Sequence, residues 1–291
     1  MLRRCSLILA AMAASTLDWS GAAHAAPAAA EQRLSRITIR SVGEGDMPVI
    51  FIPGLASPPS VFDEAAAKIE KGNRLVFVQV NGFAGSPPGT APLDDLIPGA
   101  VDELAGWMAA NHLGKAAVVG HSMGGLMALM LAKRHPEAAS RLLIVDALPF
   151  YGMLFGPTAT PDTVRPLVEQ MRAGLVSGTA PAQVPPHMTN SETNKAKILE
   201  WLKSSDPKTV GEALVEDATT DVRPDLPSMT IPVTVLYAVP TPANKAMADA
   251  LYASAYKALP NVKLNPIAGS EHFIMLDQPT QFDDALTYFL R

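Results

Sequence analysis

Short apolar runs alternate with amphipathic stretches along most of the chain. Runs rich in Val, Ile and Leu, typical of buried strands, occur at residues 36–42, 48–52, 75–80, 115–119, 141–145, 233–238 and 262–267. Helix-like patterns lie among them at residues 61–69, 97–110, 125–134, 243–259 and 278–290. Strands that alternate with helices build a parallel sheet that helices cover on both faces. We therefore predict an α/β fold with a mostly parallel central sheet.

This alternation stops between residues 147 and 230, where prolines are frequent and no strand pattern occurs. Val164, Leu167, Val168 and Met171 recur at the spacing of one helix face. Asp206 followed by Pro207 is typical of a helix start, with an N-cap and a first helical residue. We expect residues 147–230 to form a helical cap inserted between two parts of one core, residues 36–146 and 231–291.

The N-terminus carries the pattern of an export signal. Two arginines, Arg3 and Arg4, precede an apolar run at residues 5–14, and Ala23-His24-Ala25 matches an A-x-A cleavage site. We predict a signal peptide at residues 1–25, a flexible leader at 26–35, and a periplasmic or secreted protein. The apolar run is too short to span a bilayer, so no stable membrane anchor is expected. The arginine pair leaves both the general secretory and the twin-arginine routes open.

Composition narrows the classes of partner. Hydrophobic residues make up 48% of the chain and charged residues 18%, as in a folded protein rather than a disordered one. Lys and Arg number 23 against 28 Asp and Glu, with no basic block, so nucleic acid is not an expected partner. Cys5 is the single cysteine, and no Cys/His cluster has metal-ligand spacing. We expect neither a metal nor an organic cofactor, and the oligomeric state stays open.

Residues 120–124 read Gly-His-Ser-Met-Gly, which satisfies the pattern G-x-S-x-G. The pattern lies between a predicted strand and a predicted helix. A serine at such a junction occupies a tight turn that presents its hydroxyl at the end of the strand, and glycines on either side avoid collisions. The helix N-terminus adds N–H donors that suit a developing oxyanion. We therefore predict that Ser122 is a nucleophile.

A serine hydroxyl needs a base that takes its proton. His272 follows the predicted strand at residues 262–267, and loops after parallel strands converge at one edge of the sheet, where Ser122 is expected. The other candidates have simpler explanations: His112 and His135 lie near helix ends, and His121 is expected to point away from the serine. His187 lies in the proline-rich cap. His272 is therefore the predicted base.

These segments together resemble the α/β-hydrolase superfamily, as a serine esterase or lipase with a helical cap. The resemblance rests on the serine turn, on residues 50–55 (Ile-Phe-Ile-Pro-Gly-Leu), 221–226, 231–233 and 270–273, and on Asp277-Gln278-Pro279. It covers residues 36–291 and is weakest in the cap. It implies the chain order nucleophile, acid, histidine. It also implies an oxyanion hole from the amides of Leu55 and Met123, although Pro53 stands where many members have histidine.

The acid is the member of the triad that departs from the usual pattern. The family usually places it in the loop after the strand at residues 233–238, where this chain has Thr241. Threonine cannot carry the charge that stabilises an imidazolium. A minority of the family places the acid one strand earlier, which here is Asp146. We therefore predict Asp146 as the acid; Asp249 and Asp277 are poorer candidates, because the first lies in a helix and the second starts one.

The resulting hypothesis is a serine hydrolase of carboxylic esters, with Ser122, His272 and Asp146 as its triad. An apolar cap favours medium-sized hydrophobic esters. We predict substrate contacts from four cap residues, Met153, Phe155, Met171 and Met188. A proline-type aminopeptidase, amidase, lactonase or C–C bond hydrolase with the same triad remains open. So does a non-catalytic receptor that keeps the fold, because the usual acid position is empty.

Overall fold

The computed structural model describes residues 30–291 except 157 and 181. Its centre is a twisted sheet with the strand order β1-β2-β4-β3-β5-β6-β7-β8. The strands are β1 (Ala30–Arg33), β2 (Ile37–Val42), β3 (Met47–Ile52), β4 (Asn73–Val80), β5 (Ala116–His121), β6 (Ala139–Val145), β7 (Val233–Val239) and β8 (Val262–Ala268). Strand β2 runs antiparallel to β1 and β4, and the pairs from β4 onward are parallel. The predicted fold class is therefore confirmed.

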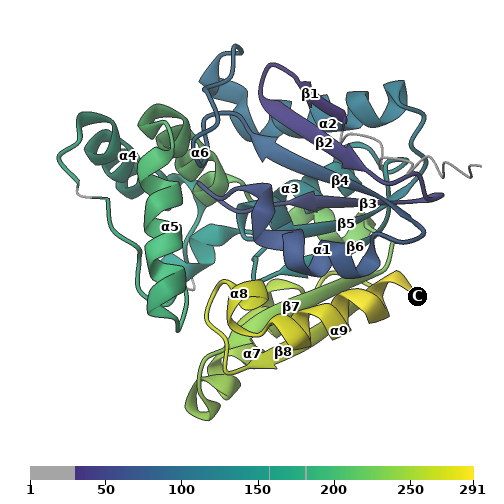
Figure 1. Ribbon diagram of the computed structural model, residues 1–291. Helices are drawn as coiled ribbons and strands as arrows, with labels where there is room; N and C mark the ends of the chain where they lie inside the picture. The colour runs from purple at the N-terminus through teal and green to yellow at the C-terminus, as the bar shows by residue number, and fades with distance from the viewer. Residues whose placement is uncertain (1–29, 157, 181) are drawn as a thin grey trace, which may run out of the picture.

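Two layers of helices cover the sheet (Figure 1). Successive strand residues point to opposite faces, so Ile50 packs on one side of β3 and Phe51 on the other. The first side is covered by α2 (Leu96–Ala110), α3 (Met123–Arg134) and α7 (Lys245–Ala255). The second side is covered by α1 (Asp63–Ile69), α8 (Ile274–Asp277) and α9 (Pro279–Leu290). Burial on both faces explains why the central strands are continuous apolar runs.

Strand β1 corrects part of the predicted leader. Residues 30–33 pair with β2, with Ala30 opposite Ser41 and Arg33 opposite Thr38. The segment reads Ala-Glu-Gln-Arg and has no apolar alternation, so its pairing comes from backbone hydrogen bonds at the edge of an existing sheet. The predicted signal peptide at residues 1–25 lies outside the described residues. Within the described ranges, no helix combines the length and apolar character that crossing a bilayer needs.

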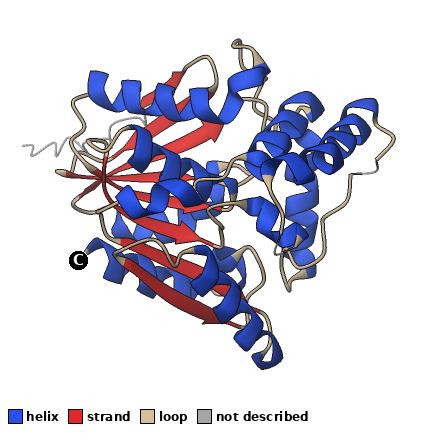
Figure 2. Ribbon diagram, turned by 180° about the vertical axis from the view of Figure 1, so that it is seen from behind, coloured by secondary structure: helices blue, strands red, loops and turns tan. Residues whose placement is uncertain are grey.

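Helices gather in the segment between β6 and β7, beyond the ends of the parallel strands (Figure 2). They are η3 (Tyr151–Phe155), α4 (Pro161–Ser177), α5 (Glu192–Ser204), α6 (Pro207–Thr219) and η4 (Arg223–Ser228). We call residues 147–230 the cap. The predicted start of α6 is observed, since Asp206 Oδ2 accepts a hydrogen bond from Thr209 N at 2.8 Å. The helix predicted from Val164, Leu167, Val168 and Met171 is observed as α4, in which Val164 and Val168 are buried and Leu167 and Met171 are exposed.

Backbone hydrogen bonds join the cap to the loops that leave the strands. Asp206 N donates to Gly82 O at 2.7 Å, just after β4. Val222 N donates to Pro149 O at 2.9 Å, just after β6. The cap is thus held over the edge of the sheet at which β4, β5, β6 and β8 end.

Candidate active site

Ser122 occupies a sharp turn between β5 and α3. Its φ of 55° and ψ of −125° lie in a region that non-glycine residues rarely adopt. The turn is held by Ser122 N, which donates to Val145 O at 3.0 Å. A Cβ at Gly120 would lie 2.2 Å from Gly124 O, and a Cβ at Gly124 would lie 2.1 Å from Ile52 O. The two glycines are therefore required by close backbone approach, and the strained serine is fixed from both sides.

Asp146 occupies a second strained position, directly after β6, with a φ of 47°. Its amide N–H donates to Leu236 O at 2.7 Å. Its Oδ1 accepts hydrogen bonds from Ala238 N at 2.8 Å and from the Tyr252 hydroxyl at 2.9 Å. Burial, followed by the nearby charge of Asp146, raises the pKa of Tyr252 well above its ordinary value. Tyr252 therefore keeps its proton and serves as a donor to Asp146.

The other oxygen of Asp146 holds His272. Asp146 Oδ2 lies 2.7 Å from His272 Nδ1, and both side chains are largely buried. Because a carboxylate only accepts, Nδ1 carries the proton and Nε2 keeps a lone pair that can take one. The acid and the base of the predicted triad thus meet in the arrangement that a proton-accepting histidine needs.

His121 connects the serine turn to the loop of His272. Its Nε2 lies 3.1 Å from His272 O, and the two imidazole rings have centroids 4.6 Å apart. Ser122 follows His121 directly, so Ser122 and His272 lie at the same edge of the sheet. Ser122 Oγ forms no hydrogen bond with His272 in the described part of the chain, as is common for catalytic pairs before substrate binds.

The predicted oxyanion donors lie beside the serine. A Cβ at Gly54 would lie 2.9 Å from Ser122 Cβ, so the 54–55 backbone passes directly against the serine. Met123 is the first residue of α3, where a helix leaves its N–H groups without intrahelical partners. Neither the Leu55 nor the Met123 amide donates to another described residue. Two amides next to one nucleophile can bind the oxygen of a tetrahedral intermediate.

Contacts with the cap fix the loop of His272. His272 N donates to His187 O at 3.1 Å, and Phe273 N donates to Met188 O at 2.9 Å. Asp277 accepts from Glu271 N at 2.9 Å on the loop and from the Thr189 hydroxyl on the cap. Asp277 therefore links the two segments and does not contact the imidazole.

The other candidate acids lie apart from His272. Thr241 donates its hydroxyl proton to Asn244 Oδ1 at 2.6 Å on the exposed start of η5 (Pro242–Asn244). Asp249 accepts from the Tyr237 hydroxyl at 2.8 Å and from Lys245 Nζ at 2.5 Å. Among the described carboxylates, Asp146 is the one that hydrogen bonds to His272.

The four predicted substrate contacts lie in different surroundings. Met153 and Met188 are half-buried and pack against core clusters. Phe155 is 41% exposed and packs edge-on against Tyr151, and Met171 is 44% exposed on α4. Substrate binding by all four stays a prediction, and exposure favours it least for Phe155 and Met171.

Two residues near the triad were missing from the sequence prediction. Tyr252 supports Asp146, but a tyrosine within a helix gives no signal of that role. Asp217 in α6 is 6% exposed, and burial raises its pKa to about 7, an effect that the charge of His272 partly offsets. A signal was available for Asp217: it continues the buried spacing of Val210, Ala213 and Leu214, where a charged residue is unexpected.

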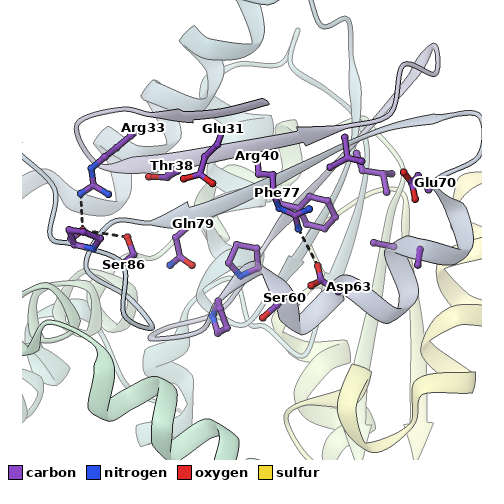
Figure 3. Close-up of a pocket in the computed structure, with 17 residues that line it drawn as sticks. Glu31, Arg33, Thr38, Arg40, Ser60, Asp63, Glu70, Phe77, Gln79 and Ser86 are labelled. Atoms are coloured by element: carbon purple, nitrogen blue, oxygen red, sulfur yellow. Dashed lines mark hydrogen bonds and ion pairs between the residues drawn. The ribbon is translucent and has the colours of Figure 1, made fainter. Parts of the chain in front are cut away.

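A surface hollow of about 620 Å³ lies elsewhere, on the outer strands (Figure 3). Arg40 of β2 lies over the Phe77 ring there, 4.0 Å from its centroid, and pairs with Asp63 at 3.2 Å. The hollow contains none of Ser122, Asp146 and His272. It is therefore separate from the candidate active site.

Comparison with known proteins agrees with this geometry. Residues 49–285 match the model of the alpha/beta hydrolase family. A pimeloyl-[acyl-carrier protein] methyl ester esterase of Nitrosomonas europaea is 26% identical over 73% of this chain and 85% of its own length. An sn-1-specific diacylglycerol lipase of Danio rerio is 30% identical over 37% of this chain, and the match spans only 34% of the lipase.

Solved structures share the fold. An esterase from Thermogutta terrifontis superposes with a TM-score of 0.71 at 20% identity, over 90% of this chain and 98% of its own. An enol-lactonase from Burkholderia xenovorans superposes with a TM-score of 0.67 at 17% identity, over 87% and 96%. The family match covers most of the chain, from β3 to α9, and the sheet order and the serine turn fit it. This protein therefore belongs to the alpha/beta hydrolase family.

Proposed function

We propose that the protein is a serine hydrolase that cleaves carboxylic esters through an acyl-enzyme intermediate. The observation that carries the proposal is the 2.7 Å contact between Asp146 and His272 beside the strained turn of Ser122. A largely buried carboxylate that orients a histidine near a half-buried serine hydroxyl is the arrangement that activates a serine. The esterase activity named for relatives such as the Nitrosomonas europaea protein supports the same substrate class.

In the proposed reaction, Ser122 Oγ attacks the ester carbonyl carbon while its proton moves to His272 Nε2. The amides of Leu55 and Met123 bind the oxyanion, and Asp146 stabilises the imidazolium. The C–O bond then breaks, and His272 gives its proton to the leaving alkoxide. Water loses a proton to His272 and attacks the acyl group, which leaves as an acid and returns Ser122 to its hydroxyl form.

The test combines covalent labelling with turnover. Wild type should react with a fluorophosphonate at Ser122 and hydrolyse p-nitrophenyl acyl esters. Ser122→Ala should do neither, while the matched control Ser86→Ala should behave like wild type, because Ser86 lies on an exposed loop. A folded wild type, checked by circular dichroism, that stays unlabelled would favour a non-catalytic receptor.

The bond that is cleaved is tested in the same assay. Amino-acid p-nitroanilides, lactones and β-diketones are run beside the esters at equal concentration. Anilide cleavage without ester turnover would replace the ester proposal with an aminopeptidase or amidase. Lactone or C–C cleavage alone would indicate those activities instead.

We also propose that the protein acts in the periplasm or outside the cell, on the evidence of the export pattern at residues 1–25. Expression in a bacterial host should then give a periplasmic protein whose first residue is Ala26 by mass spectrometry. An uncleaved cytoplasmic product would contradict this.

A further inference from the structure

Asp217 is a buried carboxylate that the proposed mechanism does not use. It lies in the last turn of α6 and is 6% exposed. Its side chain has no hydrogen-bond or ion-pair partner among residues 30–291 as described. Buried charges are normally paired, because an ion loses its favourable hydration when it is removed from water. An unpaired carboxylate in the core therefore needs an explanation.

The surroundings of Asp217 are apolar and adjoin the catalytic group. Its neighbours Val215 and Ala218 pack in a cluster with Phe150 and Val164, against which Tyr151 also packs. Phe150 and Tyr151 follow Asp146 by only a few residues, so this cluster begins on the segment that leaves the end of β6. The charge of His272 acts on Asp217, and the charge of Asp217 acts on Tyr151. Asp217 is thus close enough to His272 and Tyr151 for their charges to interact.

The carboxylate oxygens of Asp217 are accessible to solvent. Among the described residues, the one side-chain polar atom that is both sealed from water and without a partner is His121 Nδ1. The Asp217 oxygens also have no partner, so they are not sealed: the small exposed area of this residue includes its carboxylate. A group the size of water can therefore reach the carboxylate of Asp217.

Asp217 does not duplicate Asp146, since Nδ1 of His272 is already bound to Asp146 Oδ2. The opposite face of the site offers amides of Leu55 and Met123 that donate. Asp217 offers acceptors instead, beside a cluster of apolar side chains. In binding sites of this kind a few polar groups set orientation and specificity.

We propose that Asp217 is a specificity-determining residue that accepts a hydrogen bond from a hydroxyl or amino group of the substrate. The inference rests on the proposed function and names its substrate class, which is esters with a donor group on the part of the molecule that lies under α6. Burial raises the pKa of Asp217 to about 7, so a bound donor would offset the cost of its charge near neutral pH.

The test compares matched esters. Ethyl esters of straight-chain acids are assayed beside their hydroxy and amino counterparts, and acetates of alkanols beside those of diols and amino alcohols. In wild type, at least one donor-bearing ester should have a kcat/KM about 10-fold or more above its plain counterpart. In Asp217→Leu, which has no acceptor, that ratio should fall by about 10-fold or more, whereas Asp217→Asn, whose amide oxygen still accepts, should keep part of it. Comparing the hydroxy-substituted with the amino-substituted esters shows which of the two groups donates to Asp217.

Asp162→Asn is the matched control, because Asp162 is an exposed carboxylate of the same cap in the first turn of α4. It should leave the ratio at the wild-type value. An unchanged ratio in both Asp217 variants, or no donor preference anywhere in the wild-type series, would overturn the inference. Labelling of Ser122 and turnover of plain esters report on the proposed function separately, so the two failures are distinguishable.

Discussion

At the scale of single residues, Asp146 is the carboxylate with the most closely fixed position near His272. Asp146 is held by Leu236 O, Ala238 N and Tyr252 before it touches His272. Three partners fix one carboxylate, so its Oδ2 is oriented before any substrate binds. Preorganised groups of this kind stabilise charge in the transition state without reorganisation.

We predict that Asp146→Asn lowers kcat for a p-nitrophenyl ester by several orders of magnitude. The amide cannot stabilise the imidazolium and can hold the ring in the wrong tautomer; the corresponding change in serine proteases costs about 10⁴-fold. Thr241→Ala serves as the control and should change kcat little, because Thr241 bonds only to Asn244 among the described residues. Near-normal turnover in Asp146→Asn would remove Asp146 from the mechanism.

His121 is the second residue whose effect we expect to be kinetic. Burial, and then the charge of His272, lower the pKa of His121 well below its ordinary value, so it stays neutral. Its Nε2–H donates to His272 O, which leaves Nδ1 without a proton or a partner.

His121→Phe keeps a ring of similar shape and removes the donor to His272 O. We expect kcat to fall by about 10- to 100-fold with little change in KM, because a small displacement of the base has a large effect on rate. Thermal unfolding measured by circular dichroism reports any loss of packing. A variant that loses stability but keeps the wild-type kcat would show that His121 is only structural.

At the scale of elements, α6 matters because it carries Asp217 and packs against α4 and η3. Its start is fixed by Asp206, whose Oδ2 accepts from both the amide and the hydroxyl of Thr209. Gly82 has a φ of 98° and lies under Thr209, so the loop after β4 fits the first turn of the helix. The cap is thus attached where α6 begins.

Asp206→Ala should lower the free energy of unfolding by about 1 kcal/mol, the usual effect of losing an N-cap. The measurement is urea unfolding followed by circular dichroism. Asp162→Ala is the comparison, since Asp162 lies in a first turn but Thr160 caps that helix. Equal effects of both substitutions would indicate a general loss of charge rather than a cap.

At the scale of the whole molecule, Asp217 should make stability depend on pH. Its pKa is raised from 3.8 to about 7, so the folded protein holds a proton that the unfolded chain releases at lower pH. Below pH 4, the burial of Asp217 does not lower the free energy of unfolding. The loss of stability grows as the pH rises and reaches about 4 kcal/mol above pH 7.

Asp217→Asn removes this titration. The difference in unfolding free energy, variant minus wild type, should therefore be larger at pH 8 than at pH 5. Comparing the two proteins at each pH cancels the contributions of groups that the substitution does not affect. A difference that is constant between these pH values would show that Asp217 is ionised throughout in the folded protein.

The pattern of the sequence was enough to predict the sheet, its covering helices, the cap and the serine turn. Each depends on local chemistry: apolar runs of strand length, glycines around Ser122, and an N-cap at Asp206. Strand β1 was missed because edge pairing uses the backbone and leaves no mark in the side chains of residues 30–33. Spacing placed Leu167 and Met171 on the same face of α4 as Val164 and Val168, but spacing does not say how much of a helix face is covered, and Leu167 and Met171 are exposed.

The sequence by itself determined that a serine, a histidine and a choice of carboxylates would lie at one edge of a parallel sheet, since the succession of strands and helices along the chain and the chemistry of the turns are local properties. The family resemblance favoured Asp146 among these carboxylates, and the tertiary structure showed that Asp146 is the one that holds His272. The tertiary structure also placed His121, Tyr252 and Asp217 around the site. The contacts that Asp146, His121 and Tyr252 make at the site join residues more than a hundred positions apart. These contacts and the burial of Asp217 both depend on how the elements pack.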